Sequence, residues 1–198
     1  MSQELEIEYK NLLTQKEFDT LKHHFQLQQH DFFKQHNDYF DTYHFELKQA
    51  SAALRIRQKQ DQYTLTLKQS APSGIGLMET HQSIEQKQAE HIIATGVLPE
   101  GDVRKALRES NISTDKLQYL GRLSTERAEL AYKDGTLVLD HSFYLKKDDY
   151  ELEYEVSDAH LGRKQFDALM HEFKLPERPP QNKVQRFFVR KFNGDVES

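Results

Sequence analysis

Apolar and polar residues alternate along several short stretches of this chain, as they do on a strand that buries one face. In residues 4–10, Leu5, Ile7 and Tyr9 share one face, whereas the glutamates and Lys10 share the other. This alternation predicts a strand near the start of the chain. Similar strand-like patterns predict further strands over residues 38–43, 53–59, 63–68, 77–84, 120–132, 137–143 and 150–156.

Turn and capping signals separate these strands. Thr14 and Glu17 have the spacing of a capping box, and the apolar residues after them predict a helix over 14–27. The short link 60–62 predicts a hairpin, and Asp134-Gly135 predicts another.

The longer intervals have helical spacing. Residues 85–110 predict helix with a break near 96–101, where two glycines occur. Asp158 is the expected N-cap of a last helix that ends by Pro179-Pro180. Residues 183–192 form a basic, aromatic tail segment.

The polar faces of the predicted strands are segregated by charge. Neighbouring carboxylates on one strand face lie roughly 7 Å apart, and each ionised pair costs on the order of 2 kcal/mol at an effective dielectric of about 20. The acidic faces contain Glu4, Glu6 and Glu8 near the start of the chain and Glu151, Glu153 and Glu155 late in it. The basic residues on the strands between them are Arg55, Arg57, Lys59 and Lys68.

Two arrangements fit this segregation. A sheet with an outward charged face is the simpler one, although such a face usually mixes both signs for solubility. Alternatively, an antiparallel sheet closes into a barrel, its charged faces line the interior and its apolar faces meet outer helices. The alternation leaves both arrangements open.

A barrel interior of this kind would carry both acidic and basic side chains, and these two kinds of charge indicate its ligand. Carboxylates are ligands for Mg²⁺ or Mn²⁺, which take one or two of them together with phosphate oxygens. Guanidinium and ammonium groups match phosphate. The pattern therefore favours a metal ion together with a chain of several phosphates.

Composition restricts the class of protein. The chain has 198 residues, of which 30% are charged and 36% hydrophobic, a globular profile. It has no cysteine, no apolar run of membrane-spanning length and no signal-peptide pattern, so we expect a cytoplasmic protein without a membrane partner. The net charge of -5 gives no overall match to nucleic acid. The glycine loop 71–76 lacks a P-loop ending, and the histidines of 26–36 lack ligand spacing.

An ordered set of motifs resembles one family. Glu6-x-Glu8-x-Lys10 resembles the ExExK signature of the CYTH superfamily, the triphosphate tunnel metalloenzymes, which includes inorganic and thiamine triphosphatases and class IV adenylyl cyclases. Further matches follow in family order, at Tyr39-Phe40-Asp41-Thr42, Arg55-x-Arg57, Lys68, Arg127, Asp140, Glu151-x-Glu153 and Lys183. They extend over nearly the whole chain.

The resemblance implies an α+β fold, an antiparallel closed β-barrel of about eight strands that forms a polar tunnel, with helices packed outside. It implies a single CYTH-like domain over residues 1–198. The metal ligands that it implies for Mg²⁺ or Mn²⁺ are Glu6, Glu8, Asp140, Glu151 and Glu153. Asp140 either binds the ion directly or assists through a water molecule. The phosphate-binding residues that it implies are Lys10, Arg55, Arg57, Lys68, Arg127 and Lys183.

The same resemblance implies catalytic roles for Lys68, Tyr39 and Lys183, with Tyr39 either paired with Lys68 or simply lining the tunnel. Glu4 and Glu155 are expected behind the ligands or at the tunnel mouth, and Arg122 on the surface.

We therefore expect a metal-dependent hydrolase of a small-molecule triphosphate, most simply inorganic triphosphate, because no pocket for a base or a thiamine is evident. Hydrolysis of thiamine or nucleoside triphosphates, adenylyl cyclase activity and non-catalytic binding of polyphosphate or a nucleotide are the alternatives. The sequence does not fix the oligomeric state.

Overall fold

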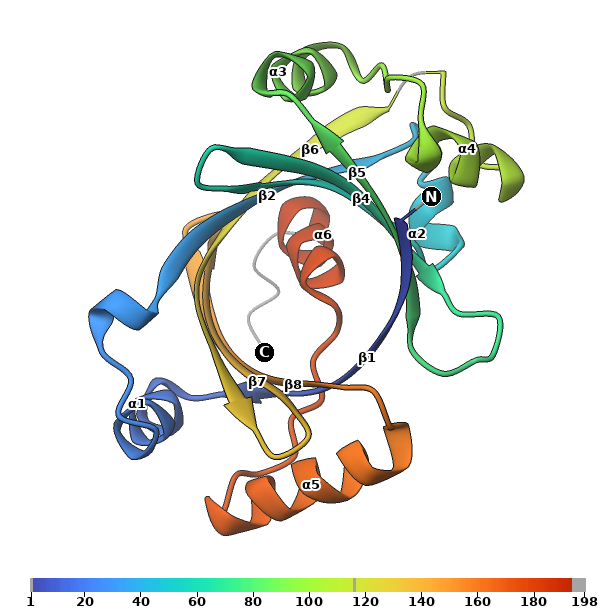
Figure 1. The fold of residues 1–198 in the computed structure, drawn as a ribbon. Helices are drawn as coiled ribbons and strands as arrows, with labels where there is room; N and C mark the ends of the chain where they lie inside the picture. The colour runs from blue at the N-terminus through green and yellow to red at the C-terminus, as the bar shows by residue number, and fades with distance from the viewer. Residues whose placement is uncertain (1, 116, 194–198) are drawn as a thin grey trace. The chain divides into compact units, whose positions relative to one another are not determined.

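The protein is described here by a computed structural model, which covers residues 2–115 and 117–193. Within these residues, antiparallel strands form a closed barrel in the order β1-β5-β4-β3-β2-β6-β7-β8 (Figure 1). The predicted α+β fold on a closed antiparallel barrel is thus confirmed. The strands are β1 (Ser2–Leu13), β2 (Phe33–Asp41), β3 (Ala53–Lys59), β4 (Gln62–Ser70), β5 (Leu77–Ile84), β6 (Gln118–Tyr132), β7 (Gly135–Tyr144) and β8 (Lys147–Val156).

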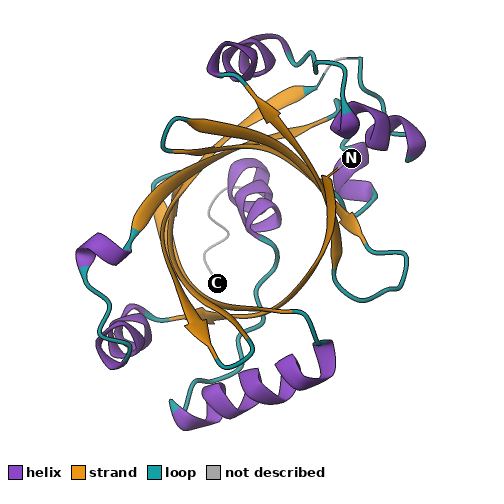
Figure 2. Ribbon diagram, in the orientation of Figure 1, coloured by secondary structure: helices purple, strands orange, loops and turns teal. Residues whose placement is uncertain are grey.

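The helices connect or follow these strands (Figure 2). The capping box at Thr14 and the break at Gly96 are confirmed. No helix among the described residues is long and apolar enough to cross a membrane. The helices are α1 (Gln15–His24), the 3-10 turn η1 (Gln29–Asp31), α2 (Glu46–Gln49), α3 (Gln86–Thr95), α4 (Asp102–Glu109), α5 (Ala159–Glu172) and α6 (Lys183–Asn193).

Several element boundaries differ from the prediction, among them those of the first two strands and the first helix. The first strand extends to Leu13, and α1 ends at His24, before the predicted Leu27. The second strand begins earlier, at Phe33, and ends at Asp41. It ends there because the carboxylate of Asp41 accepts hydrogen bonds from the backbone N–H groups of Thr42, Leu47 and Lys48, and so turns the chain into α2.

The chain divides into two compact units. Unit 1 comprises Met1–Leu5 and Gln35–Leu123, and unit 2 comprises Glu6–Lys34 and Ser124–Ser198. The expectation of a single domain over residues 1–198 stays a prediction.

The apolar strand faces of each unit pack against its own helices. In unit 2, Leu139, Leu152 and Tyr154 form a core with Phe18 of α1 and Phe166 of α5. In unit 1, the equivalent core joins the apolar residues of β3 and β4 to α2, α3 and α4, with Leu54, Ile56, Leu65, Leu67, Leu47, Ile92 and Leu107 among its members. This packing fixes which face of each strand bears the charges, because neighbouring residues point to opposite faces.

The helix α6 lies on the other side of the sheet of unit 2 from α1 and α5 (Figure 1). Its side chains Lys183 and Arg186 contact Glu151, whose strand neighbour Leu152 packs into the core on the opposite face. The sequence pattern indicated only a basic, aromatic segment here. The structure makes it a helix on the charged face.

Two glycines with similar backbone angles allow a matched test of packing. Gly96 ends α3 with φ of 72°, and a Cβ built there would lie 1.8 Å from the carbonyl oxygen of Leu117. Gly74 has φ of 74°, and a Cβ there would meet nothing within 4 Å. Both positions carry the cost of a left-handed backbone, but only Gly96 carries a clash.

We expect Gly74→Ala to lower the free energy of unfolding by about 1–2 kcal/mol, the cost of the left-handed backbone alone. Gly96→Ala should lower it by about 2–5 kcal/mol, because the backbone of Leu117 must also move. Urea denaturation of both variants measures the difference, and equal losses would contradict the clash.

Candidate functional site

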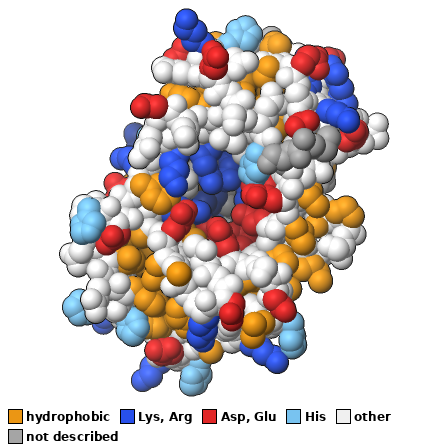
Figure 3. Space-filling model, in the orientation of Figure 1, with side chains coloured by type: hydrophobic (Ala, Val, Ile, Leu, Met, Phe, Trp, Pro, Cys, Tyr) orange, Lys and Arg blue, Asp and Glu red, His pale blue; other side chains and the backbone are white. Residues whose placement is uncertain are grey.

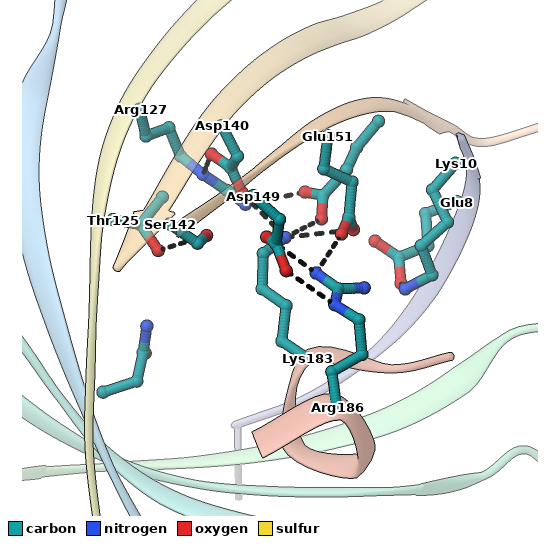
Figure 4. Close-up of polar contacts among 12 residues, drawn as sticks. Glu8, Lys10, Thr125, Arg127, Asp140, Ser142, Asp149, Glu151, Lys183 and Arg186 are labelled. Atoms are coloured by element: carbon teal, nitrogen blue, oxygen red, sulfur yellow. Dashed lines mark hydrogen bonds and ion pairs between the residues drawn. The ribbon is translucent and has the colours of Figure 1, made fainter. Parts of the chain in front are cut away.

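Unit 2 gathers buried carboxylates on the charged faces of β7 and β8. Asp140 and Glu151 have 0% of their surface exposed, and Glu153 has 3%. The strand register explains the gathering: Asp140 lies opposite Glu151 across β7 and β8, and Arg127 lies opposite Asp140 across β6 and β7. These residues were predicted from positions far apart in the sequence, and the structure places them together (Figure 4).

Lys183 is the central cation of this group. Its Nζ lies 2.8 Å from Asp140 Oδ2 and 3.1 Å from Glu151 Oε1, and it also contacts Glu153. Burial opposes the charge of Lys183, but Asp140, Glu151 and Glu153 outweigh it and hold the pKa of the amine well above its ordinary value. Lys183 therefore stays protonated at neutral pH.

Arg127 is held in a fixed orientation. Its Nε and Nη2 donate to the two oxygens of Asp140, both at 2.7 Å, and Nη2 also donates to Glu153 Oε2 at 2.6 Å. Burial opposes the ionisation of Glu153, but Lys183 and Arg127 outweigh it and hold its pKa well below the usual range. Glu153 is therefore ionised.

Arg186 and Asp149 belong to the same network and were missed from the sequence (Figure 4). Arg186 Nε lies 3.1 Å from Asp149 Oδ2, and its Nη2 lies 2.5 Å from Glu151 Oε2. The available signal was the spacing of Lys183 and Arg186, which places both on one face of a helix. Asp149 continues the acidic alternation of β8 by one step toward its N-terminus.

Glu8 and Lys10 of β1 lie beside this group. Lys10 is opposite Glu153 in the register, and its Nζ lies 2.5 Å from Glu8 Oε1. Burial opposes the charge of Lys10, but Glu8, Glu153 and Glu151 outweigh it and raise its pKa. Burial raises the pKa of Glu155 to about 7 against the opposing effect of Arg127, and Glu153, Glu6 and Glu8 act in the same direction as burial. Glu8 lies opposite Glu155 in the strand register.

Unit 1 carries the predicted phosphate-binding residues Arg55, Arg57 and Lys68 on one face of its strands. The register places Tyr39, Arg55, Thr66 and His81 in one row across β2, β3, β4 and β5. Arg55 is 8% exposed, and its Nε has no hydrogen-bond partner among the described residues. A buried guanidinium with an unmet donor is suited to an anion.

Arg57 and Lys68 flank this row on either side. Arg57 Nε donates to Asn37 Oδ1 at 3.0 Å, and Lys68 forms an ion pair with the buried Glu79. Glu79 is a further functional candidate that sequence reasoning did not select. It lies opposite Lys68 in the register, which only the strand pairing reveals.

The positions of Tyr39 and Arg122 in unit 1 refine what the sequence predicts for them. Tyr39 is buried on β2 opposite Arg55, so the strand of Arg55 lies between Tyr39 and Lys68. Arg122 is half-exposed, and it donates from Nε and Nη2 to the two oxygens of buried Asp38 at 2.9 and 2.7 Å. Arg122 is thus a structural partner of Asp38 as well as a surface residue.

The space-filling view shows the charge segregation directly. Lys and Arg side chains gather in one group on the visible face, and Asp and Glu side chains gather in another (Figure 3).

The acidic group of unit 2 makes stability depend on pH. Burial and neighbouring Glu153 raise the pKa of Glu151 from 4.5 to about 7, against the opposing effect of Lys183. Between pH 4.5 and about 7, Glu151 therefore holds a proton in the folded protein that it has released in the unfolded chain. Stability from this group is therefore complete below about pH 4.5 and falls as the pH rises to 7.

We expect Glu151→Gln to remove this dependence. Without added metal, the unfolding free energy of the wild type should fall more steeply than that of the variant between pH 5 and 7, by up to about 1.4 kcal/mol per pH unit. Urea denaturation at several pH values measures both slopes, with exposed Glu109→Gln as the control. Parallel slopes for wild type and Glu151→Gln would contradict the assignment.

Comparison with known proteins agrees with this geometry. The family described as CYTH domain matches residues 4–188. The chain is 48% identical over 191 residues to a Bacillus subtilis (strain 168) protein named "Putative triphosphatase YjbK", covering 96% of this chain and 98% of that protein.

Solved structures show the same fold. A Bacillus halodurans protein described as "a putative adenylate cyclase" superimposes with a TM-score of 0.91 at 40% identity, covering 95% of this chain and 100% of that one. The Hippeastrum protein HpAC1 superimposes with a TM-score of 0.77 at 23% identity, covering 94% of this chain and 97% of that one. With a family match over nearly its whole length, this chain belongs to the CYTH domain family.

Proposed function

We propose that this protein is a metal-dependent triphosphatase and that inorganic triphosphate is its preferred substrate. The observation that carries the proposal is Arg55, a buried guanidinium whose Nε has no hydrogen-bond partner among the described residues. The name of the similar Bacillus subtilis protein, "Putative triphosphatase YjbK", supports the same reaction class.

We assign phosphate binding to basic side chains that each unit contributes. Arginine forks match the paired oxygens of a phosphoryl group, whereas lysines act as point charges. Arg127 is oriented for this role, because Asp140 holds two of its donors. The full set that we propose is Lys10, Arg55, Arg57, Lys68, Arg127 and Lys183.

The acidic group of unit 2 has the donor chemistry for a divalent ion. All its ligands are carboxylate oxygens, the type that Mg²⁺ and Mn²⁺ prefer. Burial is the main cause of the raised pKa of Glu151, and Glu153 adds to it against the opposing effects of Lys183 and Arg186. The ligands that we propose are Glu6, Glu8, Asp140, Glu151 and Glu153.

The reaction would be in-line attack of water on a terminal phosphoryl group, which depends mostly on positioning and charge neutralisation. Lys183 keeps its proton because three carboxylates surround it, so it acts as a cation toward phosphoryl oxygens and not as a base. Tyr39 and Lys68 remain proposed catalytic residues. A bound divalent ion supplies charge neutralisation and Lewis acidity.

The first test is a substrate panel with purified protein. We expect phosphate release from inorganic triphosphate with Mg²⁺ or Mn²⁺, and its loss on addition of a chelator, because the buried carboxylates need an ion to hold the substrate. Thiamine triphosphate and ATP are measured in parallel, with detection of cyclic AMP. Cyclic AMP as the main product from ATP would show a cyclase and contradict the proposed hydrolase. Binding without turnover would indicate a binding module.

The second test addresses Arg55. We expect Arg55→Ala to lower kcat/KM for the preferred substrate by about 10²–10³-fold, because a desolvated donor to a charged group is lost. Arg108→Ala is the matched control. It removes an arginine from the same unit, on the exposed surface of α4, where its partner is Glu100. Equal activity of the two variants would remove Arg55 from the site.

A further inference from the structure

A second group of possible metal ligands lies in unit 1. It consists of Glu4 at the start of β1 with Glu79 and His81 of β5, here called the His81 cluster, and its ligand atoms all lie within 4.8 Å of one another. We propose that the His81 cluster binds a divalent transition-metal ion such as Zn²⁺. This proposal does not depend on the proposed function.

The spacing of the donor atoms fits one ion. His81 Nε2 lies 3.0 Å from Glu4 Oε1 and 3.2 Å from Glu79 Oε2. Zinc bonds to imidazole nitrogen and carboxylate oxygen are about 2.0–2.2 Å long, so two ligands of one ion lie roughly 3–3.5 Å apart. The cluster therefore needs little rearrangement to share an ion.

The imidazole of His81 is oriented from behind. Its Nδ1 lies 3.1 Å from the hydroxyl oxygen of Thr66, which is buried and lies opposite His81 in the register. A metal-bound histidine usually donates its other ring N–H to such an acceptor. With Nδ1–H donating to Thr66, the lone pair of Nε2 points toward the two carboxylates.

The two oxygens of Glu79 have different neighbours. Oε1 forms the ion pair with Lys68, and Oε2 lies toward His81. The amine thus neutralises one carboxylate of the cluster while leaving a ligand atom directed at the imidazole. Glu4, whose side chain is largely exposed, provides the route by which an ion from solvent reaches the cluster.

The ligand types select the class of ion. One imidazole with two carboxylates suits Zn²⁺, Co²⁺ or Mn²⁺, whereas Mg²⁺ prefers oxygen ligands alone. The acidic group of unit 2 contains only oxygen ligands. Excess Mg²⁺ should therefore compete for that group and leave the His81 cluster available to Zn²⁺.

An ion here would also fasten the start of β1 to β5. Apart from the His81 cluster, Gln3 Nε2 donates to Thr80 Oγ1 at 3.2 Å, so the strand end already has one side-chain contact to β5. Zinc binding should stabilise the folded protein by mass action, with a rise of about 5–10 °C in Tm at free zinc of 100 times the Kd.

The experiment is calorimetric titration of the full-length, chelator-treated protein with Zn²⁺ in excess Mg²⁺, together with Tm measurements. We expect one zinc ion to bind the wild type. His81→Asn should weaken this binding by about 100-fold or more and abolish the rise in Tm, and Thr66→Val should weaken it by about 10-fold. The matched control is His30→Asn, which removes an exposed histidine whose carboxylate neighbour is Asp31. This variant should bind zinc like the wild type.

A Tm measured without metal shows whether each variant is folded. If His81→Asn does not fold, Thr66→Val still tests the proposal, because it leaves all three ligands in place. Absence of zinc binding in the wild type, or equal affinity in the wild type and His81→Asn, overturns the proposal. In the first case His81 acts as an ordinary hydrogen-bonding partner of the two carboxylates. Neither result bears on triphosphate hydrolysis, which is assayed separately.

Discussion

Compensation of buried carboxylates is the constraint on which the charged face of unit 2 depends. Asp140 and Glu151 are fully buried, and removing a carboxylate from water costs several kcal/mol unless cations and hydrogen bonds replace the solvent. Lys183 contacts both of them, and Arg127 and Arg186 hold one each. Because Lys183 and Arg186 belong to α6, these ion pairs bind the last described helix to the sheet, together with its buried Phe187 and Phe188.

The same strands supply both the charged face and the core. On β8, Glu151 and Glu153 alternate with Leu152 and Tyr154, which pack against α1 and α5. A shift of one residue in register would exchange the two sets, placing carboxylates in the apolar core. Packing of the outer helices therefore fixes the register of the charged face, and substitutions in the core can disturb the site without touching it.

How far the sequence predicts this structure depends on whether a feature is local. Alternation along β3 and β8, the capping box at Thr14 and the Asp134-Gly135 turn are local signals, and each marks its element correctly. The ordered charged motifs identify the residues that the structure gathers in unit 2.

The features that were missed depend on tertiary contacts. Glu79 is a single acid in a polar strand, and only its pairing with β4 brings it to Lys68. Arg186 follows Lys183 by three residues, but α6 is placed by ion pairs to Asp149 and Glu151, which lie more than thirty positions earlier in the chain. Glu79 meets Lys68 only through the pairing of two strands, and Arg186 meets its partners only in the folded chain, so neither role could be read from a local pattern.

The two units bury charged groups that suit different ligands. Unit 2 buries Asp140, Glu151 and Glu153 side by side, and burial together with neighbouring Glu153 raises the pKa of Glu151 to about 7. Unit 1 instead buries Arg55 with an unmet Nε donor. An anion would satisfy the donor of Arg55, and a divalent ion would suit the carboxylates of unit 2. Each unit, taken by itself, therefore suits one part of the proposed ligand, the divalent ion in unit 2 and the phosphate chain in unit 1, which is why the proposed function joins a metal to a triphosphate.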